Sequence, residues 1–505
     1  MVKPTTTTRR ILSASFASWV GLLANIVIQI ALVPVYLSYW GAETYGLWLV
    51  FLSIWSFLII IYNGYQIYVG FEVIKVADRK PAVNTIMSST MIIVMGISAL
   101  LVFMSLMFWK YDTGSLLGLS AEMANLLGQL LIIYSIAWLV SGSFHGVLEK
   151  WLIPYGFNPY FSWFRTGRLV ISNLVAVISV SNGLSIFNTV FVMALSDILV
   201  FWLSSCFLIK VLRRHELGWC KNVSLLLGLS YFKGSSYLML KYLLDSIRNV
   251  GLRILLAPSL PVNQIAQFTT LRTPSNIVMQ GANSLAFAIQ PELMGAIRDK
   301  EFNKVFVLNT FIWLLISFLI IPFVYTLQLV MPFLFELWTL GKLSFDNEVF
   351  TVFSIIVVVY ALYLPLESIV KGNNLVEKQV FISALATLLL IALISWLLPS
   401  HKLLGAAFAL LIVEIVVLFL YLIFVFSWLK NAGFKVPYFL FVMTFANLLV
   451  FASLLYFMVE TNNYRFYFMI IGVVISVSFG YMTWLCYPKE IKKQLINLLV
   501  SKLKK

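Results

Sequence analysis

Charge is scarce in this sequence. Charged residues make up only 11% of the 505 residues, whereas an average soluble domain carries about 25%. Hydrophobic residues make up 61%, and the mean hydropathy is +0.96. Apolar runs of about 20 residues, the length that crosses a ~30 Å hydrocarbon core, recur along the whole chain. None of these runs shows the alternation of an outer-membrane barrel strand, so we expect an all-α polytopic membrane protein.

Cysteine is equally rare, with Cys206, Cys220 and Cys486 scattered at unpaired spacings. This pattern gives no sign of a disulfide framework or a metal site. Gly-rich phosphate loops and the HExxH and GxSxG motifs are absent. No loop between apolar runs exceeds about 25 residues, which leaves no room for a soluble catalytic domain. We therefore expect a protein that is not an enzyme and that holds neither a cofactor nor a metal.

The apolar runs predict fourteen membrane spans. Their ranges are 11–37, 45–69, 85–108, 125–147, 165–182, 187–210, 235–257, 263–290, 305–330, 347–370, 379–398, 402–428, 438–459 and 465–486. We expect two six-helix lobes around a central cavity, covering residues 1–220 and 221–430. An extra helix pair (431–486) and a basic cytoplasmic tail (487–505) follow them.

The net charge of +15 would suggest nucleic acid as a partner in a soluble protein, but membrane topology explains it better here. If the N-terminus is cytoplasmic, the inner segments and their flanks hold 27 of the 35 Lys and Arg residues, among them Lys150, Arg165 and Arg168. The outer loops hold four. By the positive-inside rule, both termini are expected in the cytoplasm.

The remaining four basic residues lie within spans seven and eight. The seventh span contains the stretch LKYLLDSIRNVGLRILL, with Lys241, Asp245, Arg248 and Arg253, and the eighth contains Arg272 beside Pro274. On a helix, Lys241, Asp245 and Arg248 fall within about 60° of one another. Four charges at ~3 kcal/mol each outweigh ten aliphatic residues at about −0.5 kcal/mol each. Span seven must therefore line a polar interior, or it does not cross.

The charges of these two spans do not balance, since one Asp faces four cations. A purely structural network of buried charges would be nearer to neutral. Arginine binds phosphate through its planar, bidentate fork. We therefore predict a cationic pathway for a phosphate-bearing substrate.

Two carboxylates stand near the middle of other spans. A shift of 220 residues superimposes spans one and two on spans seven and eight and sets Asn25 opposite Asp245. With a similar offset of 217, Asp197 in span six corresponds to Glu414 in span twelve. A carboxylate at membrane depth costs about 2.5–3.5 kcal/mol and usually faces protein or a wet cavity. We name both as candidates for coupling to H⁺ or Na⁺ and prefer Asp197, because Ser196 offers a hydroxyl ligand. A protonated acid bonded to a neighbouring helix is the alternative.

The N-terminal stretch VGLLANIVIQIALVPVYLSYWGAETYGLWLVFLSI (20–54) resembles the bacterial O-antigen and polysaccharide flippases of the multidrug/oligosaccharidyl-lipid/polysaccharide flippase superfamily. The features that carry the resemblance are LVPVYLSYWGAETYGLW, the basic N-terminus, and twelve spans plus an extra pair. The resemblance implies translocation of a polyprenyl-diphosphate-linked oligosaccharide across the bacterial inner membrane by alternating access, in O-antigen, lipopolysaccharide or other surface polysaccharide biosynthesis. It also implies that Asn25 and Gln29 face the cavity, and that membrane lipids and other polysaccharide assembly proteins are partners.

Two other functions remain open at this point. A cation-coupled drug exporter of the same superfamily would favour an acidic cavity for cationic drugs, whereas the charges here are basic. A membrane glycan polymerase or ligase usually has a large outer loop with catalytic residues, and the longest outer loops here are about 16 residues. We rank the flippase first, the exporter second and the polymerase third.

Overall fold

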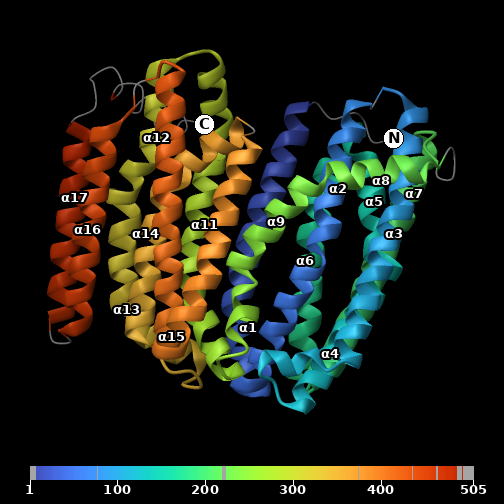
Figure 1. The fold of residues 1–505 in the computed structure, drawn as a ribbon, viewed down its shortest axis with the longest axis horizontal. Helices are drawn as coiled ribbons and strands as arrows, with labels where there is room; N and C mark the ends of the chain where they lie inside the picture. Colours follow the sequence, from blue (N-terminus) through green and yellow to red (C-terminus); the bar gives the residue numbers. More distant parts are fainter. Residues whose placement is uncertain are drawn as a thin grey trace. The chain divides into compact units, whose positions relative to one another are not determined.

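The computed structural model describes residues 7–76, 78–218, 223–373, 375–434, 436–461, 464–485 and 492. The described part of the chain is helical and contains no strand, so the predicted all-α membrane class is confirmed (Figure 1). Each of the fourteen predicted spans overlaps a helix. Apart from residue 492, the predicted basic tail lies outside the described residues.

The chain forms two compact units, residues 1–266 and 267–505. The first unit contains the helices α1 (Thr7–Leu58), α2 (Ile60–Lys75), α3 (Lys80–Lys110), α4 (Ala121–Ala137), α5 (Ser143–Leu152), α6 (Asn158–Ser181), α7 (Ile186–Arg214), α8 (Leu225–Gly234), α9 (Ser236–Asn249) and α10 (Leu252–Leu256). Serine side chains at positions 120, 185 and 224 accept from backbone N–H groups three residues on, which caps α4, α7 and α8.

The second unit contains most of α11 (Val262–Arg298), followed by α12 (Phe302–Leu315), α13 (Ile321–Thr339), α14 (Asn347–Gly372), α15 (Val376–Asn431), α16 (Tyr438–Glu460) and α17 (Arg465–Leu485). Helix α14 packs against α12, α15 and α16, and 89% of its most apolar stretch is buried inside the protein. Helix α17 packs against α13 and α16. The predicted extra helix pair therefore corresponds to α16 and α17.

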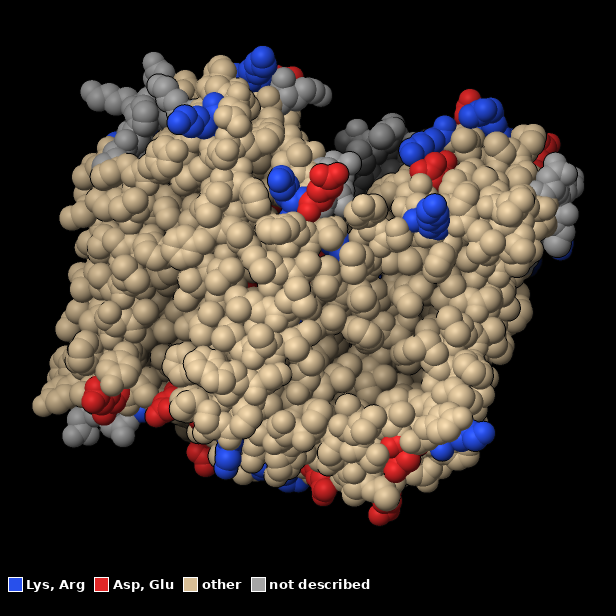
Figure 2. Space-filling view, in the orientation of Figure 1, with Lys and Arg blue, Asp and Glu red and all other residues tan. Residues whose placement is uncertain are grey.

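Ten stretches of the described chain are long and apolar enough to cross a membrane. Two of them, Phe16–Lys75 and Glu377–Asn431, each hold two predicted spans, so the ten account for twelve of the fourteen. Helices α9, α10 and α11, the predicted spans seven and eight, are not among them. On the face shown in Figure 2, charged side chains gather near the ends of the helices, and the belt between them is mostly uncharged.

Glycines in the stretch YWGAETYGLW have a physical role in the first unit. Gly41 adopts φ 76° and ψ 176°, a conformation open almost only to glycine, at the kink inside α1. At Gly46 a Cβ atom would lie 2.1 Å from the carbonyl oxygen of Val262, so only glycine allows α1 to approach the start of α11 this closely. The motif therefore sets the turn between spans one and two and a close helix contact.

The segment after α7 packs onto the first unit, which differs from the lobe boundary predicted at residue 220. Helix α8 lies across the ends of its neighbouring helices (Figure 1), and the Tyr65 hydroxyl donates to the Gly228 carbonyl over 3.3 Å. The Ser224 N–H donates to Ser89 Oγ at 3.0 Å. At the protein surface, Lys80 Nζ forms an ion pair with Glu216 Oε2 at 2.8 Å, and this contact lowers the pKa of the Glu216 carboxyl. Charge counting finds crossings but not packing partners, so the sequence could not place this boundary.

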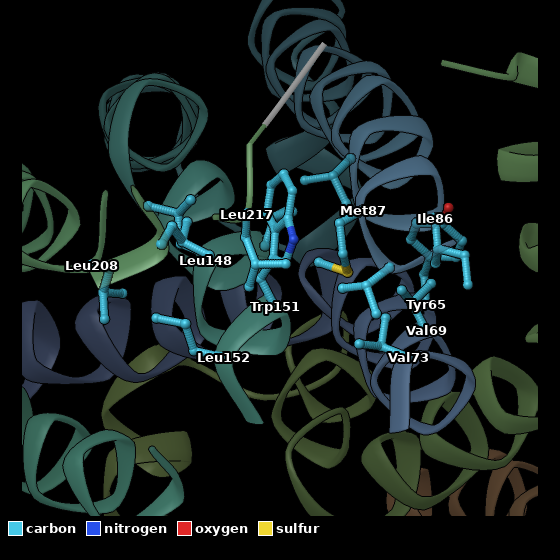
Figure 3. Close-up of a cluster of buried hydrophobic side chains, with 14 of the residues drawn as sticks. Tyr65, Val69, Val73, Ile86, Met87, Leu148, Trp151, Leu152, Leu208 and Leu217 are labelled. Atoms are coloured by element: carbon cyan, nitrogen blue, oxygen red, sulfur yellow. The ribbon is translucent and has the colours of Figure 1, made fainter. Parts of the chain in front are cut away.

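An apolar cluster joins α2, α3, α5 and α7 of the first unit (Figure 3). Its largest members include Trp151 of α5 and Tyr65 of α2, both fully buried. Leu148 and Leu152 extend the α5 contribution (Figure 3). The cluster fixes one face of α5 and leaves its other face for polar residues.

Candidate functional site

A cavity of about 510 Å³ lies within the first unit. Its walls come from the end of α1 and from α2, α5, α6, α7 and α9, together with the π-helical turn Trp138–Gly142 that joins α4 to α5. Many of the side chains that line the cavity are polar. They include Asn63, Gln66, His145, Glu149, Lys150, Arg165, Arg168, Tyr242 and Ser246.

The two faces of α5 have different neighbours. His145, Gly146 and Glu149 line the cavity, whereas Leu148 and Trp151 belong to the apolar cluster. This division follows from helical periodicity, because positions 145 and 149 share one side of the helix and 148 and 151 share another. The cluster therefore holds the polar face of α5 in place.

The first charged group of the cavity is centred on Glu149, which is 8% exposed. One carboxylate oxygen, Oε1, accepts from Arg165 Nη1 at 3.3 Å and from Lys150 Nζ at 3.5 Å. The Arg165 side chain is 57% exposed, so its guanidinium is also accessible to another anion.

The second charged group joins α6 to α7. Arg168 donates from Nη2 to Asp197 Oδ2 at 2.8 Å and from Nε to Oδ1 at 3.3 Å, a two-pronged pair. The Tyr134 hydroxyl donates to the same carboxylate over 3.5 Å. The guanidinium also lies 4.6 Å from the centre of the Phe201 ring. Together the two groups contain three cations and two carboxylates, which leaves one positive charge in surplus.

Gln66 of α2 differs from its polar neighbours. The residue is 3% exposed and lines the cavity, yet its amide Nε2 has no hydrogen-bond partner. A buried amide donor without a partner costs about 1–3 kcal/mol. Such a group in a cavity wall marks a place where a ligand could supply the missing acceptor.

Close packing around the π-helical turn Trp138–Gly142 holds α2 and α5 together where they line the cavity. Tyr62 donates its hydroxyl to the carbonyls of Gly142 (3.3 Å) and Ser143 (3.0 Å). A Cβ atom at Gly146 would lie 2.0 Å from that hydroxyl, so only glycine fits there. Single π-helical turns inside α-helices are frequently found at functional sites.

His145 is held by neutral partners. Its Nε2 lies 2.8 Å from Ser204 Oγ, which in turn lies 2.9 Å from the Tyr160 hydroxyl. The imidazole stacks on Phe164 with 4.4 Å between ring centres. These contacts explain a buried histidine without a catalytic role. Among the described residues, no group of three or more His, Cys, Asp or Glu side chains could hold a metal ion.

The charged stripe predicted in span seven lies on α9 and is partly buried. The residues by which α9 lines the cavity are Tyr242 and Ser246. On a helical wheel these two lie about 110° from the centre of the stripe formed by Lys241, Asp245 and Arg248. The stripe therefore lies on a face next to the one that lines this cavity, and its role in substrate binding stays a prediction.

Arg253 is half-buried and contacts α1. Its Nη1 donates to Ser53 Oγ at 3.3 Å and lies 3.5 Å from the Leu49 carbonyl oxygen, both on α1. Arg272 on α11 and Asn25 and Gln29 on α1 are each half-buried. Helix α11 continues through Pro274. The substrate-binding role of these residues stays a prediction.

The two carboxylates named for ion coupling are both buried, Asp197 at 6% and Glu414 at 4% exposure. Each accepts from a tyrosine hydroxyl, Asp197 from Tyr134 on span four and Glu414 from Tyr363 on span ten, the latter at 2.6 Å. The shift of 220 residues that sets spans one and two on spans seven and eight also sets span four (125–147) on span ten (347–370). The same pairing of tyrosine and carboxylate therefore occurs in both units.

The residues that surround the cavity were not predicted as site residues from the sequence. Arg165 and Arg168 were assigned to the inner segments and their flanks, whereas both lie in α6 and line the cavity. A buried Asp197 needs a cation, and this requirement was the available signal for Arg168. No sequence signal marked Gln66, because an unpartnered amide is visible only once the neighbouring helices are placed.

No protein-family model matches the sequence, and no curated protein matches it significantly. Solved structures match over most of its length. The structure of the lipid II flippase MurJ in an inward closed conformation matches with a TM-score of 0.65 at 16% sequence identity. The match covers 97% of this chain and 100% of the flippase chain.

Two multidrug transporter structures are also similar. An inward-facing MATE family transporter of the MOP superfamily has a TM-score of 0.62 at 14% identity, covering 82% of this chain and 95% of its own. The eukaryotic MATE transporter AtDTX14 has a TM-score of 0.57 at 15% identity, covering 84% and 98%. The chain shares the fold of these transporters and of the flippase.

Proposed function

We propose that the protein flips a polyprenyl-diphosphate-linked oligosaccharide from the cytoplasmic to the periplasmic leaflet of a bacterial inner membrane by alternating access, for O-antigen or other surface polysaccharide biosynthesis. The observation that carries this proposal is the surplus of positive charge around the first-unit cavity. Lys150, Arg165 and Arg168 outnumber Glu149 and Asp197 there. A basic cavity attracts an anionic cargo and repels the cationic drugs that an exporter would carry.

Chain coverage supports the same choice. The flippase structure covers 97% of this chain, whereas the two multidrug transporters cover 82% and 84%. A protein with α16 and α17 beyond twelve spans therefore matches the flippase over more of its length. The exporter stays the second candidate because the fold itself is common to both.

Loss of the protein separates the two candidates. In its native host, deletion should abolish the surface polysaccharide and leave lipid-linked oligosaccharide accumulated in the inner membrane, without any change in drug susceptibility. Mass spectrometry of extracted lipids and gel analysis of surface polysaccharide measure the first two effects. Normal polysaccharide together with increased drug susceptibility would instead establish the exporter.

Transport against a gradient needs an ion whose binding differs between the two access states. We propose Glu414 as the coupling carboxylate, in place of the preference for Asp197 drawn from the sequence. The two-pronged pair with Arg168 already compensates the charge of Asp197. This pair makes Asp197 the weaker candidate, and Glu414, which accepts from the Tyr363 hydroxyl, is the other carboxylate named from the sequence.

Matched variants in proteoliposomes test this assignment. Glu414→Gln should transport lipid-linked oligosaccharide at a rate that no longer responds to an imposed pH or Na⁺ gradient, because the amide binds neither ion as the carboxylate does. Asp197→Asn should keep the response of the parent protein. An unchanged gradient dependence in Glu414→Gln would place the coupling site elsewhere.

A further inference from the structure

The cavity of the first unit contains a donor set that its own protein partners do not use fully. Gln66 Nε2 is buried without a partner on one wall, and Arg165 and Arg168 stand on another. The two arginines are three residues apart on α6, a spacing that puts neighbouring side chains on one helix face. We propose that this cavity, inside one unit, binds a diphosphate through the Gln66 amide and the guanidinium groups of Arg165 and Arg168.

The chemistry of the donors selects the class of anion. A guanidinium group presents a planar fork that matches two oxygens of one phosphoryl group, and two such groups match the two phosphoryl groups of a diphosphate. Lys150 adds a third positive charge beside Arg165. The amide of Gln66 adds a neutral donor, and an anion oxygen supplies the acceptor that it lacks.

The carboxylates of the site keep the donors in place before the ligand arrives. Glu149 holds Arg165 at 3.3 Å, and Asp197 holds Arg168 at 2.8 Å. A diphosphate competes with both for the same N–H groups, and the cation surplus favours it over a neutral ligand. The site rests on the proposed function only for the source of the diphosphate, because the proposed function makes it part of the lipid-linked substrate.

Gln66→Leu gives the sharpest test because stability and binding should change in opposite directions. Without ligand, the purified full-length protein in detergent should melt at a higher temperature than the parent, since the variant removes a buried donor that has no partner. Binding of inorganic pyrophosphate, measured by isothermal titration calorimetry, should weaken at least fivefold. Gln328→Leu is the matched control: this glutamine is equally buried, but Asn347, Thr351 and Ser354 satisfy its amide. Its melting temperature should fall, and its pyrophosphate affinity should stay unchanged.

Charge variants add a second test, in which two substitutions should change the affinity for pyrophosphate in opposite directions. Arg165→Gln should weaken pyrophosphate binding at least tenfold, and Glu149→Gln should tighten it, because the first removes a donor and the second removes its competitor. Arg213→Gln changes an exposed arginine at the end of α7 and should have no effect. Equal affinity in all the variants, or no binding of pyrophosphate to the parent protein, would overturn the site.

Different probes identify the source of the anion. Farnesyl diphosphate should bind more tightly than pyrophosphate if the diphosphate enters as part of a prenyl lipid, and Gln66→Leu should weaken both. Binding of phosphatidylglycerol alone would contradict the diphosphate assignment. Diphosphate binding in a protein whose deletion leaves surface polysaccharide intact would keep this site and reject the flippase function.

Discussion

Arg168→Ala is expected to lower the free energy of unfolding by about 3 kcal/mol, because removing one partner of a buried ion pair leaves the other charge uncompensated. The Asp197 side chain is only 8% exposed, and Arg168 supplies both donors of its ion pair. The Tyr134 hydroxyl, 3.5 Å away, is too distant to replace them. Thermal or denaturant unfolding of the purified protein in micelles measures the change.

Two further variants test whether this loss of stability comes from the uncompensated charge of Asp197. The double variant Arg168→Met/Asp197→Leu removes both charges and should recover most of the lost stability, as replacement of a whole buried pair by apolar residues often does. Lys80→Ala breaks an ion pair whose side chains are 47% and 80% exposed, so it should change stability by less than about 1 kcal/mol. A loss for Arg168→Ala as small as that for Lys80→Ala would show that Asp197 is not structurally dependent on its pair.

The substrate pathway predicted from the sequence gives a large expected effect on transport for Arg248→Ala, in the charged stripe of α9 beside the face that lines the cavity. A hydrogen bond to a charged group contributes about 1.5–3 kcal/mol, so loss of the guanidinium should slow translocation roughly 10- to 100-fold. Cells that depend on this variant should lack surface polysaccharide while the amount of protein in the membrane stays normal. Gel analysis of the polysaccharide and immunoblotting of membranes measure both.

Arg248→Lys should restore transport only in part, because an ammonium group keeps the charge but loses the two-pronged geometry. Arg213→Ala, at the exposed end of α7, serves as the control and should leave transport unchanged. Normal polysaccharide in cells that carry Arg248→Ala would remove this residue from the substrate pathway.

Helix positions were predictable because each apolar run must be long enough to cross the bilayer core. The predicted spans 438–459 and 465–486 nearly coincide with α16 and α17. The breaks between spans one and two and between spans eleven and twelve were predictable in the same way. The kink at Gly41 in α1 falls in the predicted gap 38–44, and the kink at Lys402 in α15 directly follows the predicted gap 399–401. The fold class depends on composition and periodicity, and both are local properties of the chain.

The candidate site was less accessible to the same reasoning. A charge inside a weakly apolar span attracts notice, and Arg248 was found in this way. Arg168 lies near the end of a span that charge counting assigned to the inner side, where a cation is expected, so it was counted with the topology and not with the site. Its pairing with Asp197 links residues 29 positions apart, and a single sequence gives no measure of that distance in space.

Helix α5 separates the cavity from the apolar cluster over only ten residues. A smaller side chain at Trp151 would let the helix settle toward the cluster and would carry Glu149, and with it the grip on Arg165, away from the cavity. We therefore expect the volume of the Trp151 side chain to influence the width of the cavity, although Trp151 is not among the residues that line it. Under the proposed function, a substitution at this tryptophan would change the space open to a ligand while every polar side chain of the wall is retained.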